Sequence, residues 1–253
     1  MPQPKLFKRV YQLHFGLFRE LNDIHIFLSH TLPLLDETAT KYRAIKSTED
    51  KTFRVPSRVG KTGIAKRTPK EVASLFEKFA QRELHANLLL VCVSRFESLL
   101  NDVLRLFLNT FPEKLSAGLK GGDSSKQIPI SIVVEATTIE EARKTVAESR
   151  LQGVFYAEPK NYLAYFKSIV GVDIPEKLFN SFVEIKATRD LLIHNNGKIN
   201  ALYLRKSDKC ARGELGDRIP LDEEYFARCI SVMKSISSEI EKQVRAAHEV
   251  PVT

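Results

Sequence analysis

The sequence predicts an all-α protein, folded as one helical bundle. Eleven glycines and eleven prolines fall in clusters, which leaves long stretches in which helices can form. Within those stretches apolar residues recur at spacings of three and four, the pattern of one helical face. Only residues 128–134 look like a strand, and a single strand cannot form a sheet by itself.

The first helix is expected over residues 5–30. Pro33 lacks an amide hydrogen, so we expect it to kink or end this helix, with a second segment over residues 34–45. Residues 1–67 would then form an N-terminal helical extension followed by a basic loop. One face of the first helix has seven apolar side chains: Leu6, Val10, Leu13, Leu17, Leu21, Ile24 and Leu28.

The expected loop is strongly basic. Between residues 51 and 70 the apolar periodicity stops, and seven cations occur with no acidic residue among them: Lys51, Arg54, Arg58, Lys61, Lys66, Arg67 and Lys70. Residues 59–62 resemble the end of a phosphate-binding P-loop. However, Val55 occupies the position of the glycine that this motif requires, and no buried strand precedes it, so we reject that interpretation.

Residues 68–253 are expected to form the main bundle. Thr68, Pro69 and Glu71 have the pattern of a capping box with proline at the first helical position. The helix that starts there should continue to about Thr110 and stop before Pro112. Its apolar surface is wide, which is typical of the central helix of a bundle.

Further helices are expected over residues 138–152, 159–171 and 173–196, and from residue 220 onwards. The first of these has another capping box, and the last has three acidic residues in its first turn, where they interact favourably with the helix dipole. The third should end at Asn195-Asn196-Gly197, because these residues tolerate the left-handed conformation of a helix cap.

Composition limits the classes of protein that need to be considered. The net charge of +8 and pI near 9.3 favour anionic partners such as nucleic acids without proving one. The longest apolar run has six residues, Leu88 to Val93, against the roughly 20 needed to cross a bilayer. Three scattered cysteines form neither a disulfide framework nor a zinc site. We therefore expect a cytoplasmic protein with no secretory signal, no membrane association, no cofactor and no metal.

The segment from Arg189 to Gly197 is the best candidate for a functional site. Asp190 and His194 are four residues apart, so they share a helical face and the carboxylate can accept a hydrogen bond from the imidazole. Arg189 and His194 are five apart, about 140° around a helix, and should diverge unless the helix ends or bends there. Alternatively, the two groups converge across a dimer axis.

The chemistry of these side chains suits phosphodiester cleavage without a metal. Arginine can hold a phosphate through two hydrogen bonds, and histidine can transfer protons near neutral pH. The spacing alone is a weak signal, because Arg9 and His14 repeat it. A surface cation and a helix-end imidazole with no catalytic role would have the same spacing.

The motif and its surroundings resemble the HEPN superfamily, the higher eukaryote and prokaryote nucleotide-binding domains. The matching residues are Arg189 to Gly197, Glu184 before them, Tyr203-Leu204 behind them, and Phe96 to Leu100 in the central helix. The resemblance covers about residues 68–247 and is strongest to stand-alone prokaryotic members of the RiboL-PSP type. It implies a HEPN-like bundle of four or five helices that forms a homodimer with one shared cleft.

The resemblance also implies a function, a metal-independent ribonuclease that acts as a toxin or antiviral effector. Arg189 would hold the scissile phosphate, and His194 would be the general acid and base while the ribose 2′-hydroxyl attacks. Asp190 replaces the asparagine of many members and is assigned to orient His194. Substrate-binding roles are expected for four further residues: Asn195, Lys198, Arg205 and Lys206.

Partners and alternatives follow from the same resemblance. The expected partners are RNA, a second copy of the chain, and an antitoxin or regulatory protein. The basic loop, together with Lys209 and Arg212, would contact the RNA backbone, with an affinity that falls as salt rises. One alternative is a HEPN bundle without catalysis that binds RNA or docks a partner. Another is an unrelated helical protein that binds DNA or regulates a partner.

Overall fold

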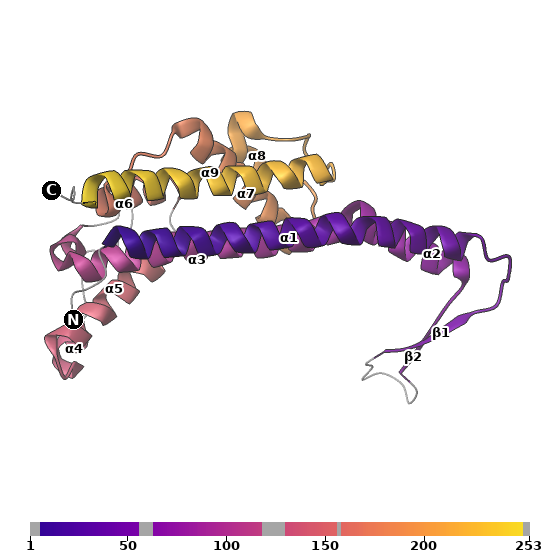
Figure 1. Cartoon of the computed structure of the whole chain (residues 1–253), viewed down its shortest axis with the longest axis horizontal. Helices are drawn as coiled ribbons and strands as arrows, with labels where there is room; N and C mark the ends of the chain where they lie inside the picture. The colour runs from indigo at the N-terminus through magenta and orange to yellow at the C-terminus, as the bar shows by residue number, and fades with distance from the viewer. Residues whose placement is uncertain (1–5, 56–62, 118–129, 156–157, 250–253) are drawn as a thin grey trace.

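The computed structural model describes residues 6–55, 63–117, 130–155 and 158–249 (Figure 1). The helices are α1 (Leu6–Arg43), α2 (Pro69–Lys78), α3 (Leu84–Thr110), α4 (Ile130–Glu135), α5 (Ile139–Phe155), α6 (Pro159–Val170), α7 (Glu176–His194), α8 (Ala201–Ser207) and α9 (Glu223–His248). The predicted all-α class is confirmed. In the described ranges the strands are limited to one antiparallel pair, β1 (Lys51–Arg54) and β2 (Ile64–Arg67).

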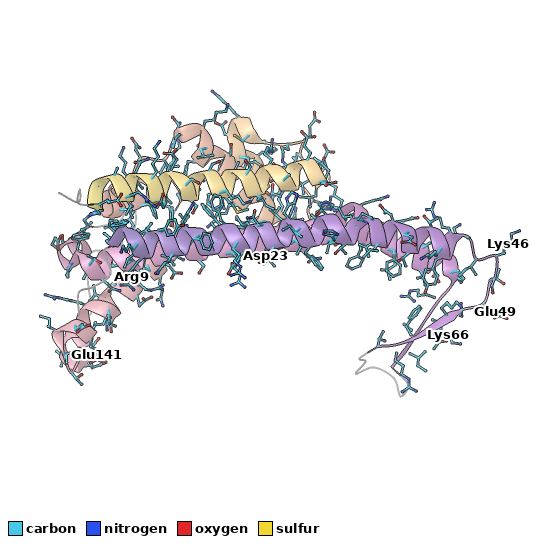
Figure 2. The ribbon with its side chains drawn as sticks, in the orientation of Figure 1. Arg9, Asp23, Lys46, Glu49, Lys66 and Glu141 are labelled. Carbon is cyan, nitrogen blue, oxygen red and sulfur yellow. The ribbon has the colours of Figure 1, made fainter. Side chains whose placement is uncertain are left out.

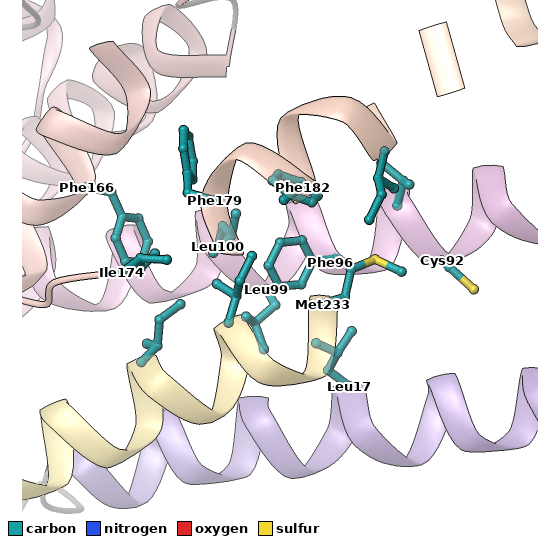
Figure 3. Close-up of a cluster of buried hydrophobic side chains, with 14 of the residues drawn as sticks. Leu17, Cys92, Phe96, Leu99, Leu100, Phe166, Ile174, Phe179, Phe182 and Met233 are labelled. Carbon is teal, nitrogen blue, oxygen red and sulfur yellow. The ribbon is translucent and has the colours of Figure 1, made fainter. Parts of the chain in front are cut away.

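The core lies where α1, α3, α7 and α9 pack together. Phe96 of α3 is fully buried, and its ring meets Phe182 of α7 edge to face, with 4.7 Å between the ring centroids. Figure 3 shows Leu17 of α1 and Met233 of α9 reaching the same cluster from the other side. Side chains of four helices, far apart in the sequence, therefore share one apolar interior.

The predicted end of the helix at Pro33 is wrong, because α1 continues through it to Arg43. Proline removes the hydrogen bond that its nitrogen would donate to the carbonyl of Ser29. Both residues are exposed, so water can reach that carbonyl and the missing bond costs little.

The first helix belongs to the packed bundle. Leu17, Leu21 and Leu28 of α1 are buried in the main core cluster. The boundary predicted between residues 67 and 68 falls between β2 and the cap of α2. In Figure 1, α1 lies along α3 for most of its length and then continues beyond α9 toward the hairpin.

The predicted helix over residues 68–110 is confirmed and contains one irregularity. Thr68 and Glu71 form both bonds of the capping box: the Thr68 amide donates to Glu71 Oε2 at 2.7 Å, and the Glu71 amide to Thr68 Oγ1 at 3.3 Å. A π-helical turn over Phe79–Glu83 divides the helix into α2 and α3. A 3₁₀ turn over Pro112–Ser116 follows its end.

The second predicted capping box differs in one bond. The Glu141 amide donates to Thr138 Oγ1 at 3.1 Å, as expected. The Glu141 carboxylate, however, accepts from the amide of Thr137 at 2.9 Å and from its hydroxyl at 2.6 Å, instead of the Thr138 amide. The predicted start and end of α6 and the predicted end of α7 are confirmed. Helix α7 begins at Glu176 after Pro175, and α9 at Glu223 with Asp222 as its N-cap, each three residues later than predicted.

Two short segments differ from expectation. Residues 130–135 form helix α4 where a strand was expected, because the described part of the chain places no strand beside them to pair with their backbone groups. Part of the expected basic loop instead forms the β1–β2 hairpin, because Thr52-Phe53 and Ile64 favour extended backbone. Arg58, Lys61, the P-loop-like residues 59–62 and residues 128–129 lie outside the described residues.

Among the residues that the structure describes, no helix has both the length and the apolar character needed to cross a membrane. The long helices α1, α3 and α9 each have polar residues along one side, and they use their apolar side to form the core.

Candidate functional site

The C-terminal end of α7 forms the cap that its sequence predicts. The amides of Asn195 and Gly197 both donate to the carbonyl of Leu191, each at 2.9 Å. Asn196 and Gly197 take positive φ angles of 50° and 70°, in the left-handed region. The helix therefore ends directly after His194, which is exposed at its last position.

Arg189, Asp190 and His194 line one open surface pocket between α7 and α8. Lys186, one turn before Arg189, lines it from α7, and Lys206 lines it from α8. A second hollow continues from this pocket past Lys186, Asp190 and Lys206 toward the start of α6. Arg189 and His194 thus reach the same pocket within a single chain, although five residues separate them.

The other predicted substrate-binding residues have different positions. Lys206 lines the pocket, whereas Asn195, Lys198 and Arg205 do not. The Asn195 side-chain amide donates to the carbonyl of Lys198 at 2.6 Å, which closes the helix cap. Lys198 and Arg205 are exposed on the surface near the pocket.

The guanidinium of Arg189 is held by two carboxylates. Nη2 donates to Glu97 Oε2 at 2.6 Å, and Nη1 donates to Asp190 Oδ1 at 3.0 Å. The other oxygen of Glu97 accepts from Lys186 Nζ at 2.5 Å. Because the Glu97 side chain is only 9 % exposed, this carboxylate fixes two cations of α7 from the neighbouring helix α3.

Asp190 orients Arg189 and not His194. One of its oxygens bonds Arg189, and the other lies 3.5 Å from Lys206 Nζ. Within the described part of the chain, the His194 ring has no hydrogen-bond partner, so the predicted Asp190–His194 bond does not form. Two cations compete successfully for a carboxylate that the exposed imidazole would otherwise share.

The five charged groups leave the pocket with a small positive excess. Lys186, Arg189 and Lys206 are cations, and Glu97 and Asp190 are anions, which gives a formal charge of +1. A phosphodiester carries one negative charge, so the excess matches it. Lysine and arginine are also the residues that bind phosphate oxygens best.

A second buried carboxylate, Glu184, joins α7, α8 and α9 beneath the pocket. It is 2 % exposed and accepts bonds from the hydroxyls of Thr188 at 2.7 Å, Tyr203 at 2.9 Å and Tyr225 at 3.0 Å. Arg212 Nε donates to it at 2.9 Å. With this many donors, the charge is satisfied inside the protein, and Glu184 has a structural role.

The environment keeps the two tyrosines protonated as donors. Burial, followed by the Glu184 charge, raises the pKa of Tyr203 above its ordinary value. Burial also raises the pKa of Tyr225, and Cys229 and Glu184 add to that effect. Both hydroxyls therefore donate to Glu184 throughout the physiological pH range.

The expected role of Arg212 as an RNA-binding cation is wrong. Its guanidinium stacks on the ring of Tyr225 at 3.3 Å, and Nη1 donates to the carbonyl of Pro220 at 2.7 Å. Burial alone would lower its pKa, but Tyr225 and Glu184 outweigh that and raise it. The Arg212 guanidinium is therefore bonded within the protein, to Glu184 and its neighbours, and is not left to contact RNA.

Arg82 of the π-helical turn holds the loop that follows His194. Its Nη1 donates to the carbonyl of Ile219 at 2.7 Å, and the Ile219 amide donates to the carbonyl of Gly197 at 2.8 Å. A Cβ atom at Gly197 would lie 2.6 Å from Arg82 Nη2. Glycine is thus required there for its positive φ and for the passage of Arg82.

Lys186, which lines the pocket, and Glu97, which holds Arg189 from α3, were not assigned a role in the site from the sequence. Glu97 is a lone carboxylate between Phe96 and Leu99 in the most apolar helix, and an isolated charge in such a position needs a buried partner. Lys186 precedes Arg189 by three residues and so shares its face of α7. Both signals are present in the sequence, but neither indicates which partner is met.

The side chains of the pocket are the basis on which the chemistry of the site is inferred. Compared with protein-family models, curated proteins and solved structures, the chain has no match. No group of three or more histidine, cysteine or carboxylate side chains among the described residues is arranged to hold a metal ion. What remains is a pocket with an exposed imidazole, an oriented guanidinium and two lysines, which can bind a phosphate and move a proton.

Proposed function

We propose that the protein is a metal-independent endoribonuclease of the HEPN type, with His194 as general acid and base and Arg189 as the phosphate-binding residue. The observation that supports this most is that both side chains line one open pocket together with Lys206. The resemblance to HEPN proteins supplies the rest of the proposal: a homodimer, RNA as substrate, and a role as a toxin or antiviral effector, with an antitoxin or regulatory protein as a further partner.

In this mechanism the phosphate lies against the guanidinium of Arg189. Glu97 and Asp190 each occupy one N–H of its terminal nitrogens, and each terminal nitrogen has a second N–H that can donate to a phosphate oxygen. The same two carboxylates fix the orientation of the guanidinium before RNA binds. Lys206 adds a point charge from α8 on the other side of the pocket.

His194 moves the protons of the reaction. Its neutral ring takes the proton of the ribose 2′-hydroxyl, whose oxygen attacks phosphorus while the bond to the 5′-oxygen breaks. An imidazolium, on this chain or on the second copy, returns a proton to that departing oxygen. The products are a 2′,3′-cyclic phosphate and a 5′-hydroxyl, and the exposed position of His194 leaves room for the ribose.

One observation favours a second function, a non-catalytic module that binds RNA or docks a partner. Arg189 is bonded to two carboxylates, as an arginine with a purely structural role would be. Among the described residues, no side chain bonds the His194 ring and orients it. In that case the pocket would bind a phosphate without cleaving the strand.

Cleavage of RNA in the presence of EDTA separates the two functions. The wild type should cleave total RNA, and His194→Ala should lose about 10²- to 10⁴-fold in rate, the usual contribution of a general acid and base. The matched control is His30→Ala, which removes an exposed histidine of α1 outside the pocket and should cleave at the wild-type rate. The released ends should resist phosphatase until acid opens the cyclic phosphate.

The opposite outcomes are equally clear. Equal cleavage by the wild type and His194→Ala would mean a contaminating nuclease. No cleavage by the wild type, with RNA binding that Arg189→Ala weakens, would leave the non-catalytic module as the function.

A further inference from the structure

The β1–β2 hairpin lies apart from the pocket and from the core. Figure 1 shows it beyond the far end of α1 and α2, projecting away from the bundle. Seven of its eight strand residues are exposed, and the eighth, Ala65, is half-buried. Figure 2 shows the side chain of Lys66 at this end of the molecule, at a distance from the packed helices. The hairpin therefore contributes nothing to the core.

The positive charges of the hairpin repel one another and destabilise it when no anion is bound. Lys51, Arg54, Lys66 and Arg67 are four of its eight strand residues, and no strand residue is acidic. Lys51 is paired directly with Arg67 across the strands, an arrangement in which like charges repel. Within the described ranges none of these cations forms a close ion pair with a carboxylate, although the charge of Arg67 acts on Glu71 and helps to lower the pKa of that carboxyl, after the hydrogen bonds from Thr68. A lone two-stranded hairpin is marginally stable, and a bound polyanion would relieve this repulsion.

One face of the hairpin adds an aromatic ring to these charges. Residues two apart in a strand share a face, and so do directly paired residues, so Phe53 lies beside Lys51 and Arg67. Phe53 is 38 % exposed and lies outside the apolar core cluster, so part of its ring is free to meet a ligand. A cationic surface with an exposed aromatic ring is the combination that binds unpaired bases and their phosphates.

We propose that this hairpin is a binding site for single-stranded nucleic acid. Phe53 stacks on a base and Lys51 and Arg67 beside it contact phosphates, while Arg54 and Lys66, on the opposite face, contact the strand where it passes around the hairpin edge. A single strand is favoured over a duplex because the bases of a duplex are already stacked and offer no face to Phe53. The site is remote from the pocket and does not depend on cleavage. It would hold a strand at the far end of the molecule whether or not the pocket cuts it.

Binding can be measured by fluorescence anisotropy with the full-length chain carrying His194→Ala, so that cleavage cannot consume the probe. The probes are fluorescein-labelled 20-mers of uridine and of thymidine, and a 20-base-pair duplex. Changing Lys51, Arg54, Lys66 and Arg67 together to alanine should weaken binding of both single strands about tenfold or more. The slope of log affinity against log salt should become shallower by up to about 2.8, since each phosphate contact on a single strand contributes about 0.7.

A matched control removes the same charge elsewhere. Lys8, Arg19, Lys177 and Lys242 are exposed, distant from the hairpin, and in no ion pair within the described structure, so their joint change to alanine should weaken binding less than about threefold. Phe53→Ala should weaken single-strand binding about fivefold or more, and Phe53→Tyr should restore it. Thermal melting of each variant checks that the fold is kept.

Three results would overturn the proposal. An equal loss in the control variant would assign the effect to net charge alone. Duplex bound as tightly as single strands, with no effect of Phe53→Ala, would show a contact to the backbone only. Binding to phosphatidylserine vesicles without binding to the 20-mers would show a membrane-surface site. None of these outcomes bears on cleavage in the pocket, which the His194→Ala assay tests separately.

Discussion

Two buried carboxylates on neighbouring helices serve different purposes at the scale of single residues. Glu184 is surrounded by four donors and is satisfied within the protein, so it joins helices. Glu97 bonds Lys186 and Arg189, whose side chains still line the surface pocket. Glu97 therefore orients two cations that can meet a ligand, whereas Glu184 links the helices that form the pocket.

The role of Glu97 can be measured through Glu97→Gln. The amide cannot compensate both cations, so the free energy of unfolding in urea should fall by about 2 kcal/mol. The control is Glu148→Gln, which removes one of the two carboxylates that pair with Arg105, in a far more exposed ion pair, and should cost less than about 1 kcal/mol. Equal losses in the two variants would show that the buried pairing adds no stability.

The two buried thiols should make the folded protein less stable as the pH rises into the alkaline range. Burial raises the pKa of Cys92 and of Cys229 to about 12 from the ordinary 9.0. Because the folded pKa is the higher one, each thiol's contribution is complete below pH 9 and is lost as pH rises toward 12. The free energy of unfolding should fall by up to about 1.4 kcal/mol per pH unit for each thiol.

Cys92→Ala tests this dependence, because it should make that fall shallower between pH 9 and 11 by one thiol's share. Cys229→Ala should have the same effect by its own share. Chemical unfolding at a series of pH values gives both slopes. A Cys92→Ala slope identical to the wild type's would exclude the thiol as a cause.

At the scale of elements, a residue from a different helical segment holds the loop that follows α7. Arg82 crosses behind Gly197 to reach Ile219, and the loop that follows His194 is bonded on both sides. The π-helical turn at Phe79–Glu83 is the element that presents Arg82. Irregular turns of this kind are frequent near functional sites, and this one fixes the backbone next to the candidate catalytic histidine.

Gly197→Ala should therefore destabilise the protein by about 2 kcal/mol, because alanine is strained at a φ of 70° and its methyl group meets Arg82. Gly16→Ala is the control, since Gly16 lies inside α1 with open space around its Cβ position. That change should be neutral or stabilising by up to about 1 kcal/mol. Thermal unfolding measures both, and equal effects would contradict the close approach of Arg82.

At the scale of the whole molecule, α1 connects the helical core to α2 and the hairpin. Its N-terminal part completes the core, and its C-terminal part continues beyond α9 and supports α2 and the hairpin (Figure 1). The candidate pocket and the candidate nucleic-acid-binding hairpin therefore lie on separate parts of one connected structure.

The contribution of α1 to stability can be tested with Leu21→Ala. Leu21 is fully buried, so removing its side chain should cost 2–5 kcal/mol, roughly the range for large cavities in cores. Leu34→Ala on the same helix removes an exposed side chain and should change stability by less than about 0.5 kcal/mol. A small effect of Leu21→Ala in urea unfolding would mean that α1 is an appendage and not part of the core.

The accuracy of the sequence-based predictions depended on how local each signal was. Thr68 with Glu71 set the start of α2, and Asn195 to Gly197 set the end of α7, because those bonds form within one or two turns of the chain. Pro33 misled because its cost depends on whether water reaches Ser29. Asp190 misled because a cation from α8 and its own neighbour Arg189 were closer than His194.

The amino-acid order by itself determined the helical class, most helix ends and the presence of an arginine and a histidine at the end of α7. Only the tertiary structure decided that Glu97, 92 residues before Arg189, would hold its guanidinium, and that Arg212 would bond the buried Glu184. The physical reason is the range of the forces involved. Hydrogen bonds within a helix join residues three or four apart, whereas ion pairs and apolar packing act between whatever side chains the fold brings together.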